Sequence, residues 1–175
     1  EVASLGVQVH GGMGYIEETG AAQHYRDARI AQIYEATNGI QAIDLVTRKL
    51  PLSGGATVKA YLGELRAIAA RVRSTNDPAF GATAGRLTEA IDSLERATAW
   101  MSARLKSETK SVLAGATPYL RLFATAAGGS LLANEALAAI RLNDNGAAAS
   151  TDRIALARFF AENIAVQSAG LEATV

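Results

Sequence analysis

The chain has 175 residues, of which 49% are hydrophobic and 19% are charged, and its formal net charge is zero. This balance excludes a protein-wide field that attracts nucleic acid or an anionic membrane, and the absence of cysteine excludes disulfides and thiolate chemistry. With only two histidines we expect no metal site. We identify no leader and no apolar run of about 20 residues, so we expect a soluble, cytoplasmic protein without a membrane span.

The first residues predict a short helix and then a glycine-rich turn. Apolar residues recur at helical spacing from Val2 to Val9. The glycines at positions 11, 12 and 14 end this helix, because glycine tolerates a positive φ, and we expect a loop over residues 10–15. A chain that opens inside a periodic helix is expected to be a fragment of a longer polypeptide.

A second short helix is predicted from Thr19 or Gly20 to Arg29, and an irregular passage follows it. Thr37 is predicted to cap a third helix that runs to about Lys49. The expected buried face of that helix consists of Ile40, Ile43 and either Leu45 or Val46. Pro51, with the glycines at 54 and 55, marks the clearest boundary in the sequence. We therefore divide the chain into residues 1–50, a linker at 51–55, and residues 56–175.

Residues 56–175 predict an up-and-down bundle of about four helices, and the fold class is all-α. A stripe at helical spacing runs from Val58 to Val72, and a second helix is expected from about residue 79 to 110. Its predicted core positions are Leu87, Ile91, Leu94, Thr98, Met101 and Leu105. Thr117 and Pro118 predict the start of a third helix to Leu142, in which Gly128 and Gly129 indicate close contact with a neighbour. A turn at 143–146 and a last helix capped within 150–152 complete the bundle.

Chemistry-bearing residues are concentrated between Gln8 and Gln41. The glycine turn is compatible with phosphate binding through backbone N–H groups, or with a tight turn between two helices. Glu35 precedes an expected helix start, where it is either a solvated or capping carboxylate or a general base. The cluster of charged residues from Arg26 to Arg29 is interpreted as an ion-pair network.

Three motifs occur in order in this stretch: QVHGGMGY, YRDARI and IYEATNGIQ. Together they closely resemble the carboxyl-terminal end of the flavin-dependent acyl-CoA dehydrogenases, over about the first fifty residues. The remainder resembles, by position, length and helical pattern, the extra helical domain of a bacterial subgroup. That subgroup includes enzymes for long-chain acyl-CoA and for 3-methylmercaptopropionyl-CoA.

The resemblance implies roles for five residues. Glu35 falls on the family's catalytic base, which removes the α proton of an acyl-CoA thioester while a hydride leaves the β carbon for flavin N5, giving a trans-2-enoyl-CoA. Ala36 stands where most members have a glycine whose N–H helps to hold the thioester oxygen, and alanine keeps that donor. Thr37 matches a threonine that contacts the flavin. Gln8 and Gly12 match positions that reach the adenosine diphosphate part of FAD bound mainly by a neighbouring subunit.

The resemblance also implies partners. The family's amino-terminal helical domain and central β domain form most of the flavin and acyl-CoA site, so we expect this chain to be inactive alone and to require those domains. A homodimer or larger oligomer and electron-transfer flavoprotein are the other expected partners. Gly39 replaces a larger polar residue usual in the family, which removes one expected cofactor contact. The alternative function is a helical interaction or oligomerisation module, which the long apolar seam of residues 56–175 favours.

Overall fold

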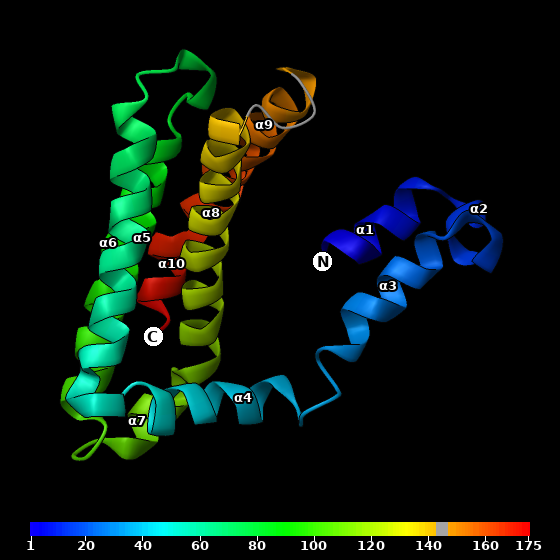
Figure 1. The fold of residues 1–175 in the computed structure, drawn as a ribbon. Coiled ribbons are helices and arrows are strands. Elements are labelled where there is room, and N and C mark those ends of the chain that lie inside the picture. Colours follow the sequence, from blue (N-terminus) through cyan, green and yellow to red (C-terminus); the bar gives the residue numbers. More distant parts are fainter. Residues whose placement is uncertain (143–146) are drawn as a thin grey trace. The chain divides into compact units, whose positions relative to one another are not determined.

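The computed structural model describes residues 1–142 and 147–175, and every regular element in these ranges is helical. This confirms the predicted all-α class. The chain divides into two compact units, Glu1–Gln41 and Ala42–Val175, which are described separately below. Figure 1 follows both units from the amino terminus in blue to the carboxyl terminus in red.

The first unit contains α1 (Val2–Val9), α2 (Gly12–Tyr15), the 3-10 turn η1 (Glu17–Thr19), α3 (Ala21–Ile30) and the first residues of α4 (Asn38–Asp44). α1 packs beside α3, and α2 lies at the turn that connects them (Figure 1). The loop predicted over residues 10–15 is wrong in part, because the chain reverses at Gly11, with φ +60, and then forms one helical turn. The irregular passage after α3 is confirmed.

The second unit is a helical bundle. Its elements after α4 are the π-helical turn η2 (Leu45–Lys49), η3 (Leu52–Gly55), α5 (Ala56–Ser74), η4 (Pro78–Phe80), α6 (Thr83–Arg104), α7 (Thr109–Ala114), α8 (Ala116–Leu142), α9 (Ala147–Asn163), η5 (Ala165–Gln167) and α10 (Ser168–Ala173). The long helices α5, α6, α8 and α9 form the expected bundle of about four helices, and α10 packs against α6 and α8 (Figure 1).

The predicted seams form the core of this bundle. α5 buries Leu62, Leu65, Ile68 and Val72, and α6 buries Leu87, Ile91, Leu94, Thr98 and Met101. The glycine pair of α8 has the expected close contact, because a Cβ on Gly129 would lie 2.8 Å from Cδ2 of Leu87 and 3.1 Å from the ring of Phe160. Small residues in α8 therefore let α6 and α9 approach its backbone.

Several predicted helix boundaries are wrong. The single helix expected over 79–110 is divided into η4, α6 and α7, since Gly81 adopts φ +51 and the chain leaves α6 after Arg104 and re-enters a helix after Glu108. α8 begins at Ala116, directly after Gly115, and not at a Thr117 cap. The last predicted helix ends at Asn163 and is followed by η5 and α10, while α9 begins before the predicted caps at 150–152. The turn predicted at 143–146 lies outside the described residues.

The buried face of α4 also differs from the prediction. Ile40 and Ile43 are 54% and 39% exposed, whereas Val46 is buried in the bundle core as one of the predicted alternatives, together with Ala42 and Leu50. Beyond Asp44 the helix continues as a π turn, in which Leu50 N–H donates to the carbonyl of Leu45. The carboxyl-terminal half of α4 and η2 thus belongs to the bundle.

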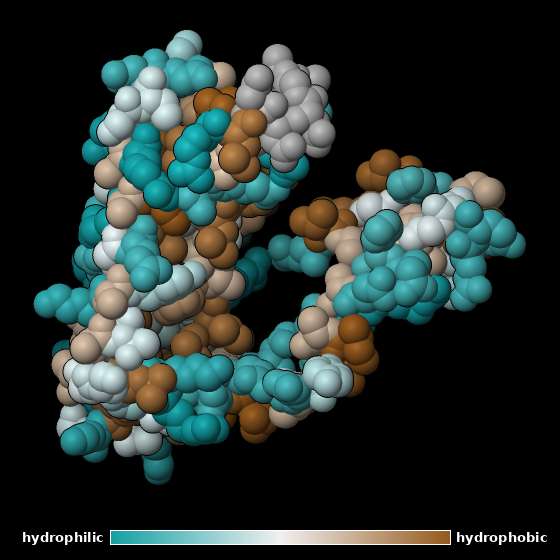
Figure 2. All heavy atoms as spheres, viewed as in Figure 1, coloured by the Kyte–Doolittle hydropathy of each residue, from teal (hydrophilic) through white to brown (hydrophobic). Residues whose placement is uncertain are grey.

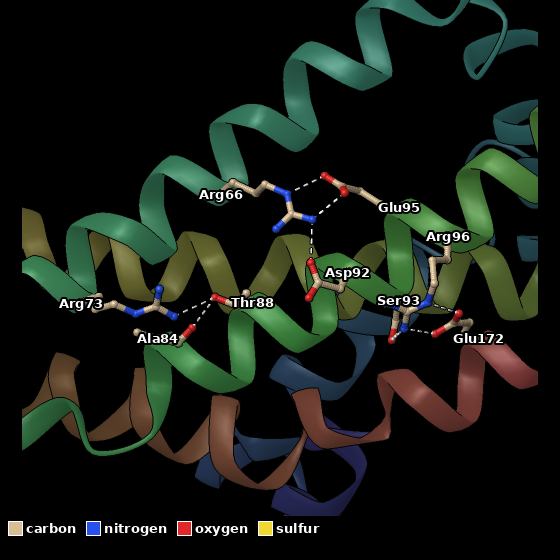
Figure 3. Close-up of polar contacts among 9 residues, drawn as sticks. All are labelled: Arg66, Arg73, Ala84, Thr88, Asp92, Ser93, Glu95, Arg96 and Glu172. Carbon is tan, nitrogen blue, oxygen red and sulfur yellow. Dashed lines mark hydrogen bonds and ion pairs between the residues drawn. The ribbon is translucent and has the colours of Figure 1, made fainter.

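Arginine–carboxylate contacts join the bundle helices at their surface (Figure 3). The guanidinium of Arg66 on α5 donates to Glu95 at 2.5 and 2.6 Å and to Asp92 at 2.6 Å, and both carboxylates belong to α6. Arg96 on α6 makes a two-bond contact with Glu172 of α10 at 2.6 and 2.7 Å. Such bidentate pairs fix the register of neighbouring helices as well as adding attraction.

Among the described helices, α8 has the length and hydropathy of a helix that could cross a membrane. This differs from the expectation that no segment has that length. The core helix of a bundle meets the same criteria, and α8 buries Tyr119, Leu122, Ala126 and Ala133 against its neighbours. This packing accounts for part of its apolar composition, while Leu131, Ile140 and Leu142 are exposed.

Candidate functional site

Glu35 lies in the irregular passage between α3 and α4. Its side chain is exposed, and its carboxylate makes no hydrogen bond or ion pair with any residue in the part of the chain that the structure describes. The main chain around it is held, because Nε2 of Gln41 donates to the Glu35 carbonyl oxygen at 2.5 Å. The carboxylate is thus presented on an anchored backbone and is available to receive a proton.

Ala36 has a left-handed backbone, with φ +78. For an L-residue with a Cβ this conformation costs about 1–2 kcal/mol, whereas glycine adopts it freely. The preference for glycine that the resemblance implies at this position therefore has a local physical reason. Ala36 adopts this conformation despite its Cβ, and the contact from Gln41 to the preceding carbonyl is one of the interactions that can offset its cost.

Thr37 begins α4 as predicted. Its carbonyl accepts from Gln41 N–H at 3.1 Å, and its Oγ1 accepts a longer contact of 3.4 Å from Ile40 N–H. At this length the side-chain hydrogen bond is weak, so the hydroxyl of Thr37 retains capacity for another partner. Thr37 is exposed and follows Ala36 directly, so residues 35–37 present a carboxylate, a backbone donor and a hydroxyl in sequence.

Gln8 lines a surface pocket of the first unit. The pocket has a volume of about 530 Å³ and is enclosed by residues of α1, α2, η1 and α3. Its lining residues are Ser4, Val7, Gln8, Gly14, Tyr15, Glu17, Ala22, Tyr25 and Arg26. Arg26 forms an exposed ion pair with Glu17 at 3.5 Å. The pocket thus combines this guanidinium–carboxylate pair with one carboxamide, one serine hydroxyl, two tyrosines and small apolar residues.

The three glycines of the turn have different structural roles. Gly11 has φ +60 and reverses the chain. Gly14 is buried, and a Cβ there would lie 2.2 Å from the carbonyl oxygen of Val7, so close packing of α2 on α1 requires glycine. Gly12 is exposed and a Cβ would meet nothing within 4 Å. Among the residues that the structure describes, no packing accounts for the glycine at 12, so its backbone is open to an approaching group.

The predicted residues fall into two separate groups. Gln8 and Gly12 lie at the α1–α2 end of the first unit, and Glu35, Ala36 and Thr37 lie beyond the far end of α3. Gly11 N–H donates to the Gln8 carbonyl at 3.0 Å, whereas Gln41 donates to the carbonyls of Glu35 and Thr37. Sequence reasoning missed Gln41 as a contact of Glu35, and it gave Arg26 only an ion-pair role. Their polar character near the motifs was the available signal.

The histidines do not form a metal centre with other residues. His10 Nδ1 lies 2.9 Å from the Gly6 carbonyl oxygen, in the last turn of α1, and His24 lies on the exposed surface of α3. Within residues 1–142 and 147–175, no group of three or more histidine, aspartate or glutamate side chains is placed to hold a metal ion.

Apolar side chains of the first unit are largely exposed. α1 buries none of its residues and α3 buries only Ala22. The exposed apolar residues include Val2, Leu5, Val9, Met13, Tyr15, Ile30, Ile33 and Tyr34. Figure 2 shows such brown side chains at the surface of this unit. A pair of helices that exposes its apolar residues in this way has the character of a surface that another polypeptide covers.

Comparisons with known proteins cover both units. Residues 1–50 match the family model "Acyl-CoA dehydrogenase, C-terminal domain", and residues 61–175 match "Acetyl-CoA dehydrogenase C-terminal like". The 3-methylmercaptopropionyl-CoA dehydrogenase of Ruegeria pomeroyi is 42% identical over 169 residues, which are 95% of this chain and 29% of that protein. A butyryl-CoA dehydrogenase of Syntrophomonas wolfei is 30% identical over 164 residues, 90% of this chain and 26% of that protein. The chain thus spans less than a third of the length of these relatives.

Proposed function

The chain belongs to the acyl-CoA dehydrogenase family, and from this premise we propose that it is the carboxyl-terminal part of an FAD-dependent acyl-CoA dehydrogenase. The reaction is the α,β-dehydrogenation of an acyl-CoA thioester to a trans-2-enoyl-CoA. In this proposal residues 1–50 complete the catalytic part and residues 56–175 form the added helical domain. The observation that carries the proposal is the exposed, unpaired carboxylate of Glu35 on an anchored backbone, within a region that matches the family model.

Glu35 is proposed to act as the general base. Its carboxylate takes the proton from the α carbon, the electron pair of that C–H bond forms the new double bond, and a hydride leaves the β carbon. FAD, when bound, supplies the acceptor for this hydride. A base positioned in this way contributes a factor of about 10² to 10⁴. The absence of an internal partner for the Glu35 carboxylate supports this role, because no ion pair has to be broken before it receives the proton.

The α proton of a thioester is weakly acidic, so the base needs assistance at the thioester oxygen. We assign this assistance to the N–H of Ala36, one residue from the base. Removing a comparable donor costs about 3–4 kcal/mol in enzymes where it has been measured. The left-handed backbone at Ala36 supports the assignment. It sets the orientation of the Glu35–Ala36 peptide, whose N–H must act on the same substrate as the Glu35 carboxylate.

The residues assigned to FAD fit an anionic dinucleotide by their chemistry. Gln8 supplies a carboxamide and lies on the same pocket as the Arg26 guanidinium, a donor suited to a diphosphate that is paired in this chain with Glu17. Gly12 is exposed, and a Cβ there would meet nothing within 4 Å, so its backbone is uncovered. Thr37 has a hydroxyl that α4 uses only weakly. In the proposed oligomer, Gln8 and Gly12 contact the adenosine diphosphate of FAD bound mainly by a neighbouring subunit, and Thr37 contacts the flavin.

The same proposal names the partners. The remaining domains of the enzyme cover the apolar surface of residues 1–41, a homodimer or larger oligomer brings Gln8 to a second subunit, and electron-transfer flavoprotein reoxidises the enzyme in the cytoplasm. The bundle is proposed to add assembly contacts, because α8 and α9 expose Leu131, Leu156 and Phe159. This second role is compatible with the first and does not require catalysis by the bundle.

Replacement of Glu35 tests the proposal. In the full-length enzyme, Glu35→Gln is expected to lower turnover by at least about 10²-fold while the flavin content stays unchanged. Glu18→Gln is the matched control, because Glu18 is also an exposed glutamate of the first unit and is predicted to leave turnover unaltered. Wild-type turnover by Glu35→Gln would place the base elsewhere. The 175-residue chain alone is expected to purify without flavin, so flavin-dependent turnover by that chain would contradict its proposed inactivity.

A further inference from the structure

We propose that Gln41 is a positioning residue, which holds the Glu35–Ala36 peptide so that the carboxylate of Glu35 and the N–H of Ala36 are presented together. The inference rests on the proposed function for its catalytic consequence. Its structural basis is independent of that function. Nε2 of Gln41 donates to the Glu35 carbonyl oxygen at 2.5 Å, across six residues of the chain.

Gln41 is fixed at its own backbone before its side chain reaches back. Its N–H donates to the Thr37 carbonyl at 3.1 Å, in the first turn of α4, and its side chain is partly buried. Ala42, the next residue, is fully buried in the bundle core. The carboxamide of Gln41 therefore extends from an ordered helix turn to the irregular passage that carries Glu35.

The geometry of the peptide bond makes this contact directional. A trans peptide is planar, and its C=O and N–H point in opposite directions. A donor bound to the Glu35 carbonyl oxygen therefore also fixes the direction of the Ala36 N–H and the position of the Glu35 Cα. Without it, the alanine would favour a negative φ, which rotates this peptide away from the observed orientation.

The catalytic consequence follows from where the N–H is needed. A donor aimed at the thioester oxygen acts most strongly when negative charge develops there, so loss of its orientation lowers kcat more than it raises KM. Gln41 does not touch the substrate in this proposal. Its effect passes through the peptide that it binds, and the effect depends on the conformational preference of residue 36.

A double-mutant cycle in the full-length enzyme tests the proposal. Gln41→Met keeps the length of the side chain and removes the donor, and we expect kcat to fall by about 10- to 100-fold with KM changed less than about threefold. In an Ala36→Gly background the loss is expected to be several-fold smaller, because glycine adopts the left-handed conformation without assistance. Gln167→Met, at an exposed glutamine of η5, is the control and is expected to leave kcat unchanged.

A spectroscopic measurement separates positioning from a general loss of structure. The carbonyl stretch of a bound 2-enoyl-CoA thioester reports donation to its oxygen, and it is expected to move toward the free-ligand value in Gln41→Met at unchanged flavin content. Equal kcat and an unshifted carbonyl stretch in Gln41→Met would overturn the proposal. If Gln41→Met lowered kcat by the same factor in the wild-type and Ala36→Gly backgrounds, the proposal would also be overturned, since the contact of Gln41 with the Glu35 carbonyl would then not act through residue 36.

The isolated 175-residue chain distinguishes failure of this proposal from failure of the proposed function. By NMR, the Gln41 side-chain amide protons are expected to exchange more slowly than those of Gln167, and the Ala36 amide resonance is expected to shift in Gln41→Met. If Glu35→Gln stays active while these NMR results hold, the assignment of the base is wrong and the positioning role of Gln41 stands. If the Gln41 side-chain amide exchanges as fast as that of Gln167, the proposed positioning role of Gln41 is wrong, whatever the role of Glu35.

Discussion

The hydroxyl of Thr98 on α6 and the phenolic oxygen of Tyr119 on α8 lie 2.8 Å apart in the buried core of the bundle. Oγ1 of Thr98 already donates its one proton to the Leu94 carbonyl at 2.7 Å. Tyr119 is therefore the donor to Thr98, and its phenol must stay protonated to make this bond. A polar contact that depends on protonation thus joins the two central helices.

Tyr119→Phe is predicted to lose less stability than the wild type as the pH rises above about 10. Burial raises the pKa of Tyr119 to about 12, above the value of about 10 in an unfolded chain. The contribution of the protonated phenol to stability is complete below about pH 10 and is lost as the pH rises toward 12, because the unfolded chain releases the proton first. The free energy of unfolding falls by an amount on the order of 3 kcal/mol. Thermal unfolding of both proteins between pH 8 and about 11.5 measures the difference. Parallel curves would contradict the raised pKa.

Gly129→Ala is predicted to destabilise the bundle by about 1–3 kcal/mol, because the added methyl would press on Leu87 and Phe160. Gly63→Ala in α5 is the matched control. A Cβ at Gly63 meets nothing within 4 Å, so alanine there is expected to stabilise its helix by about 0.5–1 kcal/mol. Urea unfolding of the three proteins gives the two changes, which must have opposite signs.

Arg66→Met is predicted to cost less than about 1 kcal/mol at neutral pH, because its carboxylate partners are more than a third exposed. Its hydrogen bonds hold the pKa of Glu95 below the ordinary value of a glutamate. The stabilisation is therefore present above about pH 4.3 and is lost as the pH falls through the lowered pKa. Melting temperatures of wild type and variant are expected to converge in acid.

Arg86→Met is the control for this prediction, since the ion pair of Arg86 with Glu89, at 2.9 Å, lies within one helix. Its effect is expected to be smaller than that of Arg66→Met, which disconnects α5 from α6. An Arg66→Met protein that melts at the wild-type temperature at every pH would show that the three-residue contact adds nothing to stability.

Periodicity predicted the bundle well, because its core is set by side-chain volume and spacing within single helices. Leu87, Ile91 and Leu94 are buried as their spacing indicates. The helix break before α6 was not predictable in the same way. There Gly81 lies against Arg158, and the Ala82 N–H donates to Glu162 at 2.9 Å, so residues of α9 that are distant in sequence shape the turn.

The candidate site shows the same division between local and distant causes. The order of the motifs predicted Glu35, Ala36 and Thr37 as site residues. Thr37 directly precedes α4, as the N-cap that its residue type indicates. The contact of Gln41 with the Glu35 carbonyl depends on a positive φ at an alanine, which residue preferences do not indicate. Apolar spacing placed Ile40 and Ile43 on the buried face, but the side of this segment that packs on the bundle carries Ala42 and Val46.

The exposed apolar residues of the first unit affect how unfolding of this chain is interpreted. Val9 is 85% exposed and α1 buries none of its side chains, so residues 1–41 contribute little enthalpy or heat-capacity change when they lose structure. The cooperative melting transition of the free chain therefore belongs to the bundle. A substitution at Glu35 or Gln8 leaves that transition unchanged even when it abolishes local order, so hydrogen exchange is the measurement that detects it.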